Sequence, residues 1–440
     1  MQFIRIHFLL AQGRNAVMLL FFLAASKISF SQFWQPVGGK MSYVTMAMAE
    51  DTVNGTLVVG GGFDTIGTNS YKSIATWNGS VWDSLGSGLN GYVKGLAIFN
   101  DTIYAGGTFT KSGNLSRKYF SRWNGASWDS LSFTTGNCDV QALQVYNGRV
   151  YVAGGFPEAG GKTVNNVASF DGSSWDSLGS GANNWVTCMT VHNNELYIGG
   201  SFDSVGGVIA NYIAKWNGAS WSAVGTGTNG VVTALGSYNG KLFAGGGFSI
   251  AGGIAANYVA SWDGSNWQPV GGGMNNAASS FHTSSGKLYA GGSFTIAGGI
   301  PANRVAKWDG TNWSALGGGV DNIVNVVTTF QNRLFAGGLF SMADGNVAKY
   351  IAQRDLLTST NYLNVHFDIS LYPNPAQDFI RIDSEKKIRS IAILNTYGQI
   401  VYSNNELLNK FIIRVENFPN GIYLIRLQDY DNNYINTCLL

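Results

Sequence analysis

One short pattern recurs seven times in this chain, at a spacing of 45 to 48 residues. In each copy an apolar run ends in two glycines, and a phenylalanine follows directly or one residue later. Repeats of this length with strand-like contents are typical of β-propellers, in which each repeat forms one blade. The sequence therefore predicts an all-β fold with a seven-bladed propeller. The seven copies begin at Gly60, Gly106, Gly154, Gly199, Gly245, Gly291 and Gly337.

The repeat between Trp82 and Trp128 shows the content of one blade. Apolar and polar residues alternate with the period of a β-strand. Asn-Gly or Asp-Gly pairs, such as Asn124-Gly125, favour tight turns between strands because both residues tolerate a positive φ. Four strands are expected, over residues 82–86, 92–99, 102–105 and 119–123.

Twelve of the 13 tryptophans follow the repeat. They form pairs with the spacing Trp-Asn/Asp-Gly-x-x-Trp, except that Phe170 replaces the first tryptophan of one pair. A tryptophan held at one place in every repeat favours packing between blades over contact with a ligand. The double glycine likewise predicts close approach of a neighbouring backbone. Only Trp185 lies outside the pattern.

The two ends of the repeat region complement each other. The last repeat ends at Arg354 without the Asn-Gly turn and without the second tryptophan. Residues 33–39 contain the missing strand, since Trp34-Gln35-Pro36-Val37 matches residues 267–270. We therefore expect the N-terminal strand to complete the seventh blade, which would leave no open edge in the ring.

Residues 1–31 resemble a secretory signal peptide, with Arg5 and Arg14 ahead of a short apolar stretch and small residues at the end. The apolar stretch is shorter than the ~20 residues that a spanning helix needs, so we expect no transmembrane segment in the mature chain. Removal of this segment, with its three positive charges, changes the formal charge from +2 to −1. A chain without a basic excess is a poor partner for nucleic acid.

Past Arg354 the repeat stops, and residues 356–366 form a linker. Residues 367–440 contain short alternating strands separated by turns, which predicts a small β-sandwich. The domains expected are thus a signal peptide (1–31), a propeller (32–355), the linker and this tail.

Two resemblances follow from these motifs. The propeller repeats resemble kelch and related bacterial repeats, which implies the fold but no activity. The tail resembles the type A C-terminal sorting domain of the type IX secretion system, found in Gram-negative bacteria. That resemblance implies export through the periplasm, with release or attachment at the cell surface. The residues that carry it are Tyr372, Pro373, Asn374, Pro375, Pro419, Gly421 and Tyr423, together with Asn395 and Gly398.

Recognition residues are expected on the loops that vary between repeats, because variable loops on a fixed scaffold are the usual place for binding. Trp185 lies in one of these loops and could stack on a sugar ring or anchor a protein, or could fill the rim of the central channel. We select Trp185, Asn183, Tyr92 and Asp139 as candidate ligand-binding residues. The loops are 88–92, 134–139, 181–185, 228–230, 274–277 and 320–322.

A second semi-regular position holds asparagine in four repeats. A ring of asparagines could bind a polar ligand, but the interpretation that each one closes its own loop by bonding to backbone is favoured. The run from Asp429 to Asn433 could hold calcium, although a polar hairpin turn is the favoured interpretation. The four asparagines are Asn165, Asn211, Asn257 and Asn303.

Catalytic and metal-binding signals are weak. The mature chain has three histidines, His192, His282 and His366, with no acid repeating beside them, so neither a metal site nor a cofactor is expected. Cys138 and Cys188 lie at different places in successive repeats, which favours two separate thiols over a disulfide. Paired carboxylates from different blades could still form a glycan-cleaving site.

These features predict a secreted or surface-attached propeller that binds a glycan, a surface polymer or a protein and depends on the type IX secretion machinery. The alternatives are a polysaccharide-acting enzyme that uses carboxylates of the loops, and a structural surface component. An enzyme is the less favoured alternative because the propeller has only three glutamates, Glu50, Glu158 and Glu195.

Overall fold

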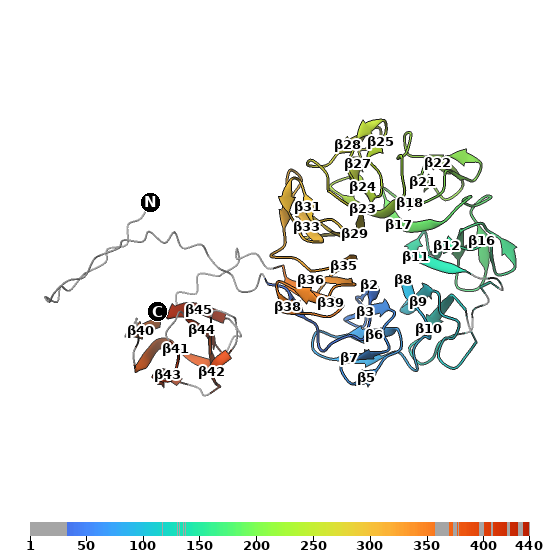
Figure 1. Cartoon of the computed structure of the whole chain (residues 1–440). Helices are drawn as coiled ribbons and strands as arrows, with labels where there is room; N and C mark the ends of the chain where they lie inside the picture. The colour runs from blue at the N-terminus through green and yellow to red at the C-terminus, as the bar shows by residue number, and fades with distance from the viewer. Residues whose placement is uncertain are drawn as a thin grey trace. The chain divides into compact units, whose positions relative to one another are not determined.

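The computed structural model describes residues 33–356, apart from 117, 130, 132, 135 and 137. In the C-terminal part it describes residues 369–372, 376, 378–395, 400–405, 408–419, 423–429 and 434–439. The predicted signal peptide and all but the first residue of the linker lie outside these residues, so their boundaries stay predictions. The chain divides into two compact units, one over Ser31–Leu363 and one that includes Asn364–Leu440 (Figure 1).

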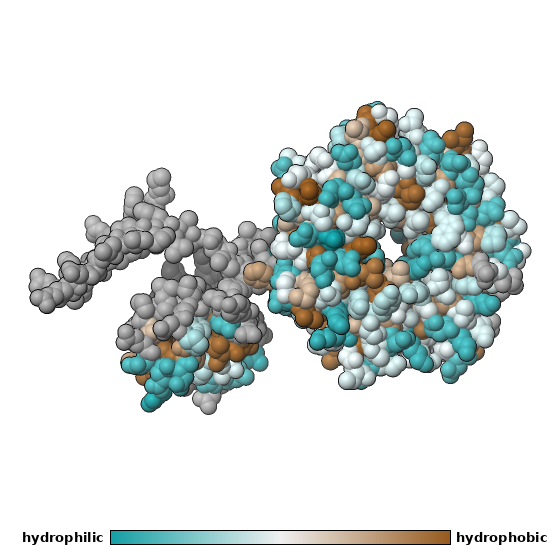
Figure 2. All heavy atoms as spheres, in the orientation of Figure 1, coloured by the Kyte–Doolittle hydropathy of each residue, from teal (hydrophilic) through white to brown (hydrophobic). Residues whose placement is uncertain are grey.

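Seven small antiparallel sheets form a ring in the first unit (Figure 1), which confirms the predicted seven-bladed propeller. One strand of each sheet lies next to the central channel, which is open in Figure 2. These inner strands of blades 1 to 7 are β2 (Thr45–Asp51), β8 (Val93–Phe99), β11 (Asp139–Tyr146), β17 (Val186–His192), β23 (Val232–Tyr238), β29 (Ala278–Ser284) and β35 (Val324–Phe330).

The other strands of each blade follow outward in chain order. The second strands are β3 (Thr56–Gly61), β9 (Thr102–Gly107), β12 (Arg149–Gly155), β18 (Glu195–Gly200), β24 (Lys241–Gly246), β30 (Lys287–Gly292) and β36 (Arg333–Gly338). The third are β6 (Ile74–Trp77), β10 (Phe120–Trp123), β15 (Val167–Phe170), β21 (Ile213–Trp216), β27 (Val259–Trp262), β33 (Val305–Trp308) and β39 (Ile351–Asp355). The fourth are β7 (Trp82–Ser84), β16 (Trp175–Ser177), β22 (Trp221–Ala223), β28 (Trp267–Pro269), β34 (Trp313–Ala315) and β1 (Gln35–Pro36).

In blade 2 the described residues of the outer strand form a bridge between Trp123 and Trp128, and the backbone N–H of Asp129 donates to the Arg122 carbonyl at 2.8 Å. Six of the blades also carry a two-stranded hairpin between their second and third strands, which the repeat pattern did not predict. The hairpins are β4 (Thr65–Ile66) with β5 (Asn69–Ser70), β13 (Glu158–Ala159) with β14 (Lys162–Thr163), β19 (Ser204–Val205) with β20 (Val208–Ile209), β25 (Ile250–Ala251) with β26 (Ile254–Ala255), β31 (Ile296–Ala297) with β32 (Ile300–Pro301), and β37 (Met342–Ala343) with β38 (Asn346–Val347).

The double glycine has a steric cause. In six copies a Cβ on the second glycine would lie 1.8–2.3 Å from a backbone carbonyl oxygen at the start of the same blade's inner strand, as at Gly107 against Tyr92. The first glycine of these copies faces the next blade, where a Cβ on Gly60 would lie 2.5 Å from Val93. Real Cβ contacts are essentially never that short, so these copies require glycine at both places. In blade 3 the copy is shifted by one residue: Gly154 faces the Asp139 carbonyl oxygen, and Ala153 takes the place that faces the next blade.

The second tryptophan of each pair ties its blade to the preceding blade. In six blades its indole N–H donates to a backbone carbonyl of that neighbour at 2.8–3.3 Å. This confirms that the repeated tryptophans pack between blades. The bonds join Trp34 to Leu316, Trp82 to Val37, Trp128 to Leu85, Trp221 to Leu178, Trp267 to Val224, and Trp313 to Val270.

The N-terminal strand closes the ring, as predicted. β1 pairs with β39 in blade 7, with Gln35 opposite Gln353. Trp34 is 1% exposed, and its backbone N–H donates to Oδ2 of Asp344 at 2.6 Å. Asp344 takes a turn position that is glycine in other blades, such as Gly298 in blade 6. The closing strand is therefore held by a carboxylate that other blades lack.

In the tail, β41 (Phe379–Leu394) is one long strand shared by two sets of partners. Its first half pairs with β40 (Ile369–Tyr372) and β43 (Leu408–Arg414), and its second half pairs with β42 (Ile400–Asn404) and β44 (Tyr423–Asp429). β45 (Tyr434–Leu439) pairs with β44. Isoleucines from both halves, including Ile382 and Ile393, share one core. The sandwich packing of these strands stays a prediction.

Candidate binding rim of the propeller

The loops that lead into the inner strands meet the hairpins on one face of the propeller, which we name the loop face. In six blades a residue of the loop forms a β-bridge with the hairpin of the same blade, or with the corresponding turn in blade 2. These bridges join Met41 to Ile66, Leu89 to Ser112, Ala182 to Val205, Thr228 to Ala251, Met274 to Ala297, and Val320 to Ala343. The variable loops are therefore firmly attached to the scaffold.

Tyr92, Asp139 and Trp185 occupy one repeat position in three successive blades. Each lies directly before the inner-strand residue that pairs with the glycine two residues before the phenylalanine of its copy: Val93 pairs with Gly107, Val140 with Gly154 and Val186 with Gly200. The structure therefore brings three of the four candidate residues to equivalent places on the rim of the channel, in blades 2, 3 and 4. We name these three residues and their immediate neighbours the binding rim.

Trp185 lies against the backbone of the preceding blade. The three atoms nearest to a Cβ built on Gly155 would all belong to its indole ring, and the closest, Cε2, would be 2.6 Å away. Trp185 is nevertheless 44% exposed, so one face of the ring packs on glycine while much of it faces solvent. Its N–H has no acceptor among the described residues, whereas the second tryptophan of six pairs donates its N–H to the preceding blade.

Tyr92 repeats this arrangement two blades away. A Cβ on Gly62 of blade 1 would lie 2.4 Å from Cε1 of Tyr92, and Tyr92 is 40% exposed. Gly62 and Gly155 occupy the same repeat position, directly before the phenylalanine. The sequence shows a further small residue at this position, Gly62 in blade 1 and Gly155 in blade 3. Its role could not be predicted, because the sequence does not show which aromatic ring lies against it.

Asp139 forms an ion pair rather than an open acidic site. Its Oδ2 atom lies 2.6 Å from Nζ of Lys94, and both side chains are mostly buried. Its Oδ1 atom is buried and has no hydrogen-bond partner among the described residues. Lys94 was not predicted as a site residue because it lies within the inner strand. The pair places a polar group on the rim between Tyr92 and Trp185.

Asn183 supports the loop that carries Trp185. Its Oδ1 atom accepts the backbone N–H groups of Asp203 and Ser204, each at 3.2 Å. The equivalent Asn229 and Asn275 make the same pair of bonds in blades 5 and 6. The side chain of Asn183 is therefore engaged within its own blade, and its contribution to binding would be through the position of Trp185.

The asparagines before the third strands close their loops, as favoured above. The amides of Asn165, Asn211 and Asn303 donate to backbone carbonyls at 2.8–3.0 Å. Two of these residues, Asn165 and Asn211, have positive φ, a conformation that asparagine tolerates better than most residues. A ring of free asparagines is therefore not formed by these three residues.

The histidines and cysteines form no metal site within the described part of the chain. His192 Nδ1 lies 2.8 Å from Ser237 Oγ, and His282 Nε2 lies 2.8 Å from Thr329 Oγ1. Each contact joins the inner strands of two neighbouring blades. Desolvation lowers the pKa of His282 to about 4. Cys138 and Cys188 are free thiols, and burial raises both pKa values, that of Cys188 to about 12. His366 and the predicted calcium-binding run after Asp429 lie outside the described residues.

The glutamates of the propeller do not converge. Glu158 lies in a hairpin of the loop face, where its Oε1 accepts a hydrogen bond from Thr134 at 3.3 Å. Glu50 and Glu195 lie at the other ends of the inner strands, near the turns that join first and second strands. Glu195 is paired with Lys215 at 2.9 Å. A catalytic pair on the loop face would therefore need aspartates.

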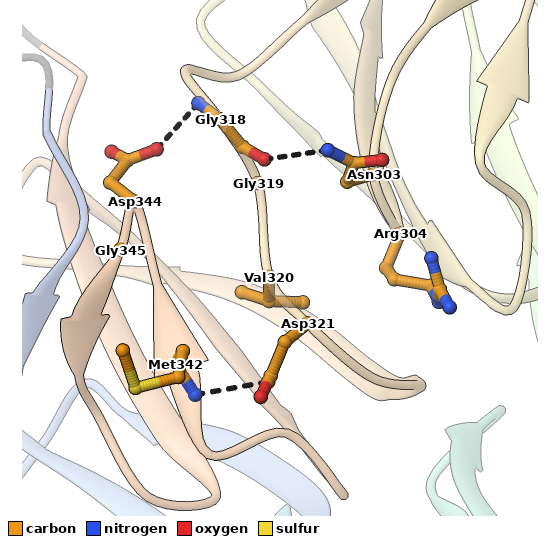
Figure 3. Close-up of a pocket in the computed structure, with 9 residues that line it drawn as sticks. All are labelled: Asn303, Arg304, Gly318, Gly319, Val320, Asp321, Met342, Asp344 and Gly345. Atoms are coloured by element: carbon orange, nitrogen blue, oxygen red, sulfur yellow. Dashed lines mark hydrogen bonds between the residues drawn. The ribbon is translucent and has the colours of Figure 1, made fainter.

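A hollow of about 360 Å³ lies between blades 6 and 7 (Figure 3). Its acidic groups are already used: Asp344 Oδ1 accepts the Gly318 N–H at 2.5 Å, and Asp321 Oδ1 accepts the Met342 N–H at 2.9 Å. Asn303 in turn donates to the Gly318 carbonyl. The bond between Asp344 and Gly318 joins blades 6 and 7, so the hollow lies at the junction of these two blades. A second hollow of about 320 Å³ includes Glu50 and lies away from the rim.

Comparison with known families identifies the tail. Residues 370–439 match the model of the secretion system C-terminal sorting domain. The protein is an exported β-propeller with a type IX secretion sorting tail. Such a tail indicates secretion or display at the cell surface. Of the motif residues that are described, Tyr423 is buried, and its hydroxyl donates to the Pro419 carbonyl at 2.6 Å. Pro373, Asn374, Pro375 and Gly421 lie outside the described residues.

Solved structures resemble this chain at low sequence identity. The extracellular domain of BT4673 from B. thetaiotaomicron has 11% sequence identity and a TM-score of 0.51, over 92% of this chain and 53% of that one. PorZ, an essential surface component of the type IX secretion system of Porphyromonas gingivalis, has 15% identity and a TM-score of 0.48, over 92% and 60%. The chain therefore spans little more than half the length of these proteins. A search of the curated proteins found no match.

No helix in the described part of the propeller and tail is long and apolar enough to cross a membrane.

Proposed function

We propose that the exported propeller binds a carbohydrate through the binding rim over blades 2 to 4, with Trp185 as its main anchor. The observation that carries this proposal is the seating of Trp185 on Gly155. One face of the indole is packed on backbone, so the ring needs little further ordering when a ligand stacks on it. Aromatic rings with an exposed face are suited to the apolar face of a sugar ring.

The polar groups of the rim fit the same ligand class. Tyr92 offers a hydroxyl and Trp185 an indole N–H, while the Lys94–Asp139 ion pair leaves this part of the rim without net charge. A small number of placed polar groups beside aromatic surface is the usual composition of a small-ligand site. The rim therefore supports a neutral carbohydrate better than a polyanion.

Binding can be tested by electrophoresis of the exported protein through gels that contain dextran, mannan, xylan or mixed-linkage β-glucan. We expect at least one polymer to retard the protein, and Trp185→Ala to weaken that binding by ~2 kcal/mol, about 30-fold. The melting temperature should stay nearly unchanged because the ring is exposed. If no polymer retards the protein, or if Trp185→Ala melts early and binds normally, the proposal is wrong.

A matched pair of glycine variants tests the seat of the ring without removing it. Gly155→Ala places a methyl group where the indole lies, so the ring must shift and binding should weaken. Gly247 occupies the same repeat position in blade 5, and a Cβ there has no atom within 4 Å. Gly247→Ala should therefore bind as the parent does. Equal effects of the two variants would contradict the role of the glycine seat.

The same polymers distinguish the alternative functions. Release of reducing sugar during incubation would favour the polysaccharide-acting enzyme that uses carboxylates of the loop face. Retardation without sugar release supports the binding function. We also propose that the tail residues Tyr372, Pro373, Asn374, Pro375, Pro419, Gly421 and Tyr423 direct recognition by the secretion machinery.

A further inference from the structure

Three tyrosines extend the aromatic surface across the closure seam. Tyr43 of blade 1 lies with its ring centroid 6.4 Å from that of Tyr92 and 5.9 Å from that of Tyr350 in blade 7. Tyr43 is 44% exposed. The three rings therefore form one arc over blades 7, 1 and 2, which we name the tyrosine arc. Tyr92 belongs both to this arc and to the binding rim.

Tyr43 occupies a repeat position at which several other blades have a loop-stabilising asparagine. Its position, two residues before the paired residue of the inner strand, is asparagine in three blades. There Asn184, Asn276 and Asn322 each accept the next backbone N–H at 2.8 Å. A tyrosine cannot make this bond, so blade 1 has given up a loop-stabilising contact for an exposed ring.

The arc shares its glycine seat with the rim. A Cβ on Gly62 would lie 2.4 Å from Tyr92 and 3.2 Å from Tyr43. One glycine thus allows two rings to lie close to the backbone of blade 1. The hydroxyls of Tyr43 and Tyr92 have no hydrogen-bond partner among the described residues, so both can reach a polar ligand. The arc combines apolar ring surface with outward hydroxyls.

We infer that the carbohydrate bound by this protein is an extended neutral chain, which runs along the channel rim from Trp185 past Lys94 and Asp139 to Tyr92 and Tyr43. This inference rests on the proposed function and specifies its ligand. Aromatic platforms at separate places suit a ligand with repeated units, because each further unit on the same chain binds at a high effective concentration. A single sugar ring could occupy only one platform.

A protein partner fits this surface less well. The Lys94–Asp139 ion pair lies between Trp185 and the tyrosine arc in blade order, so the aromatic rings of the whole surface do not form one cluster. The centre of a protein interface is instead a desolvated cluster with its anchors together.

The test is the dependence of affinity on chain length. Oligosaccharides of increasing length, prepared from whichever gel polymer retards the protein, are titrated into the exported protein by calorimetry. We expect affinity to rise about tenfold or more from the trisaccharide to the hexasaccharide. Tyr43→Ala should remove most of that increase while it leaves trisaccharide affinity unchanged, and Trp185→Ala should weaken both lengths.

The outcomes separate the inference from the proposed function. Binding that is equally tight for both lengths, or a length dependence that survives Tyr43→Ala, would overturn the extended site while carbohydrate binding stands. A protein that no gel polymer retards would overturn the proposed function itself. Val81→Ala is the matched control, because Val81 is 58% exposed and lies in a turn at the outer edge of blade 1.

Discussion

The closure of the ring makes a quantitative prediction at Trp34. Its indole is 1% exposed and packs against Val320, Leu334 and their neighbours in blades 6 and 7. Replacement by alanine removes that packing, which costs about 3–5 kcal/mol for a buried tryptophan. It also removes the 2.8 Å bond to the Leu316 carbonyl, and an unmade buried bond adds about 1 kcal/mol.

A domain of this size has an unfolding entropy of about 0.7 kcal/mol per degree, so Trp34→Ala should lower the melting temperature by roughly 6–9 °C. Scanning calorimetry of the exported protein measures this shift. Trp34→Phe keeps most of the packing and loses only the hydrogen bond, so its shift should be a fraction of that. Trp185→Ala is the control, since exposed substitutions usually change stability by less than about 0.5 kcal/mol. The circular arrangement would be refuted if Trp34→Ala had the same melting temperature as Trp185→Ala.

Two further predictions follow from the tail and from the channel wall. Deletion of residues 367–440 should leave the propeller in the periplasm, because the sorting domain at 370–439 would be lost; fractionation that finds the truncated protein in the medium at normal level would contradict this. The pKa of His282 is lowered to about 4 by desolvation, so the unfolded chain binds the proton more readily than the folded one. Stability should therefore be constant above about pH 6.5 and fall as the pH drops toward 4, and His282→Gln should flatten part of that fall in melting temperature.

The architecture could be predicted because the repeated residues occupy positions with narrow steric requirements. In six copies both glycines are needed to avoid a carbonyl or a neighbouring blade, and in six blades the second tryptophan bonds to the blade before it. Such positions change little from copy to copy, so their spacing gives the number of blades. Trp34 could be assigned to blade 7 on the same ground, since its neighbours match those of Trp267.

Other features could not be predicted because their signals are short or lie outside the repeat. Two-residue strands such as β25 are too brief to alternate, and β43 lies in a tail with no repeated copy for comparison. The loop before β11 is one residue longer than its counterparts, so Asp139 could not be aligned with Tyr92 and Trp185 until the strand register was known.

The candidate site illustrates why departures from a repeat are more informative about function than the repeat itself. Trp185 was selected because it breaks the tryptophan pattern, and the structure places it on Gly155 with an exposed face. Tyr43 breaks an asparagine pattern at another position, but the signal was hidden because that pattern is polar and occurs in only three blades. Both rings occupy places where the scaffold does not need an aromatic residue. Since an exposed ring contributes little to folding, its presence on a rigid loop is best explained by what it contacts outside the chain.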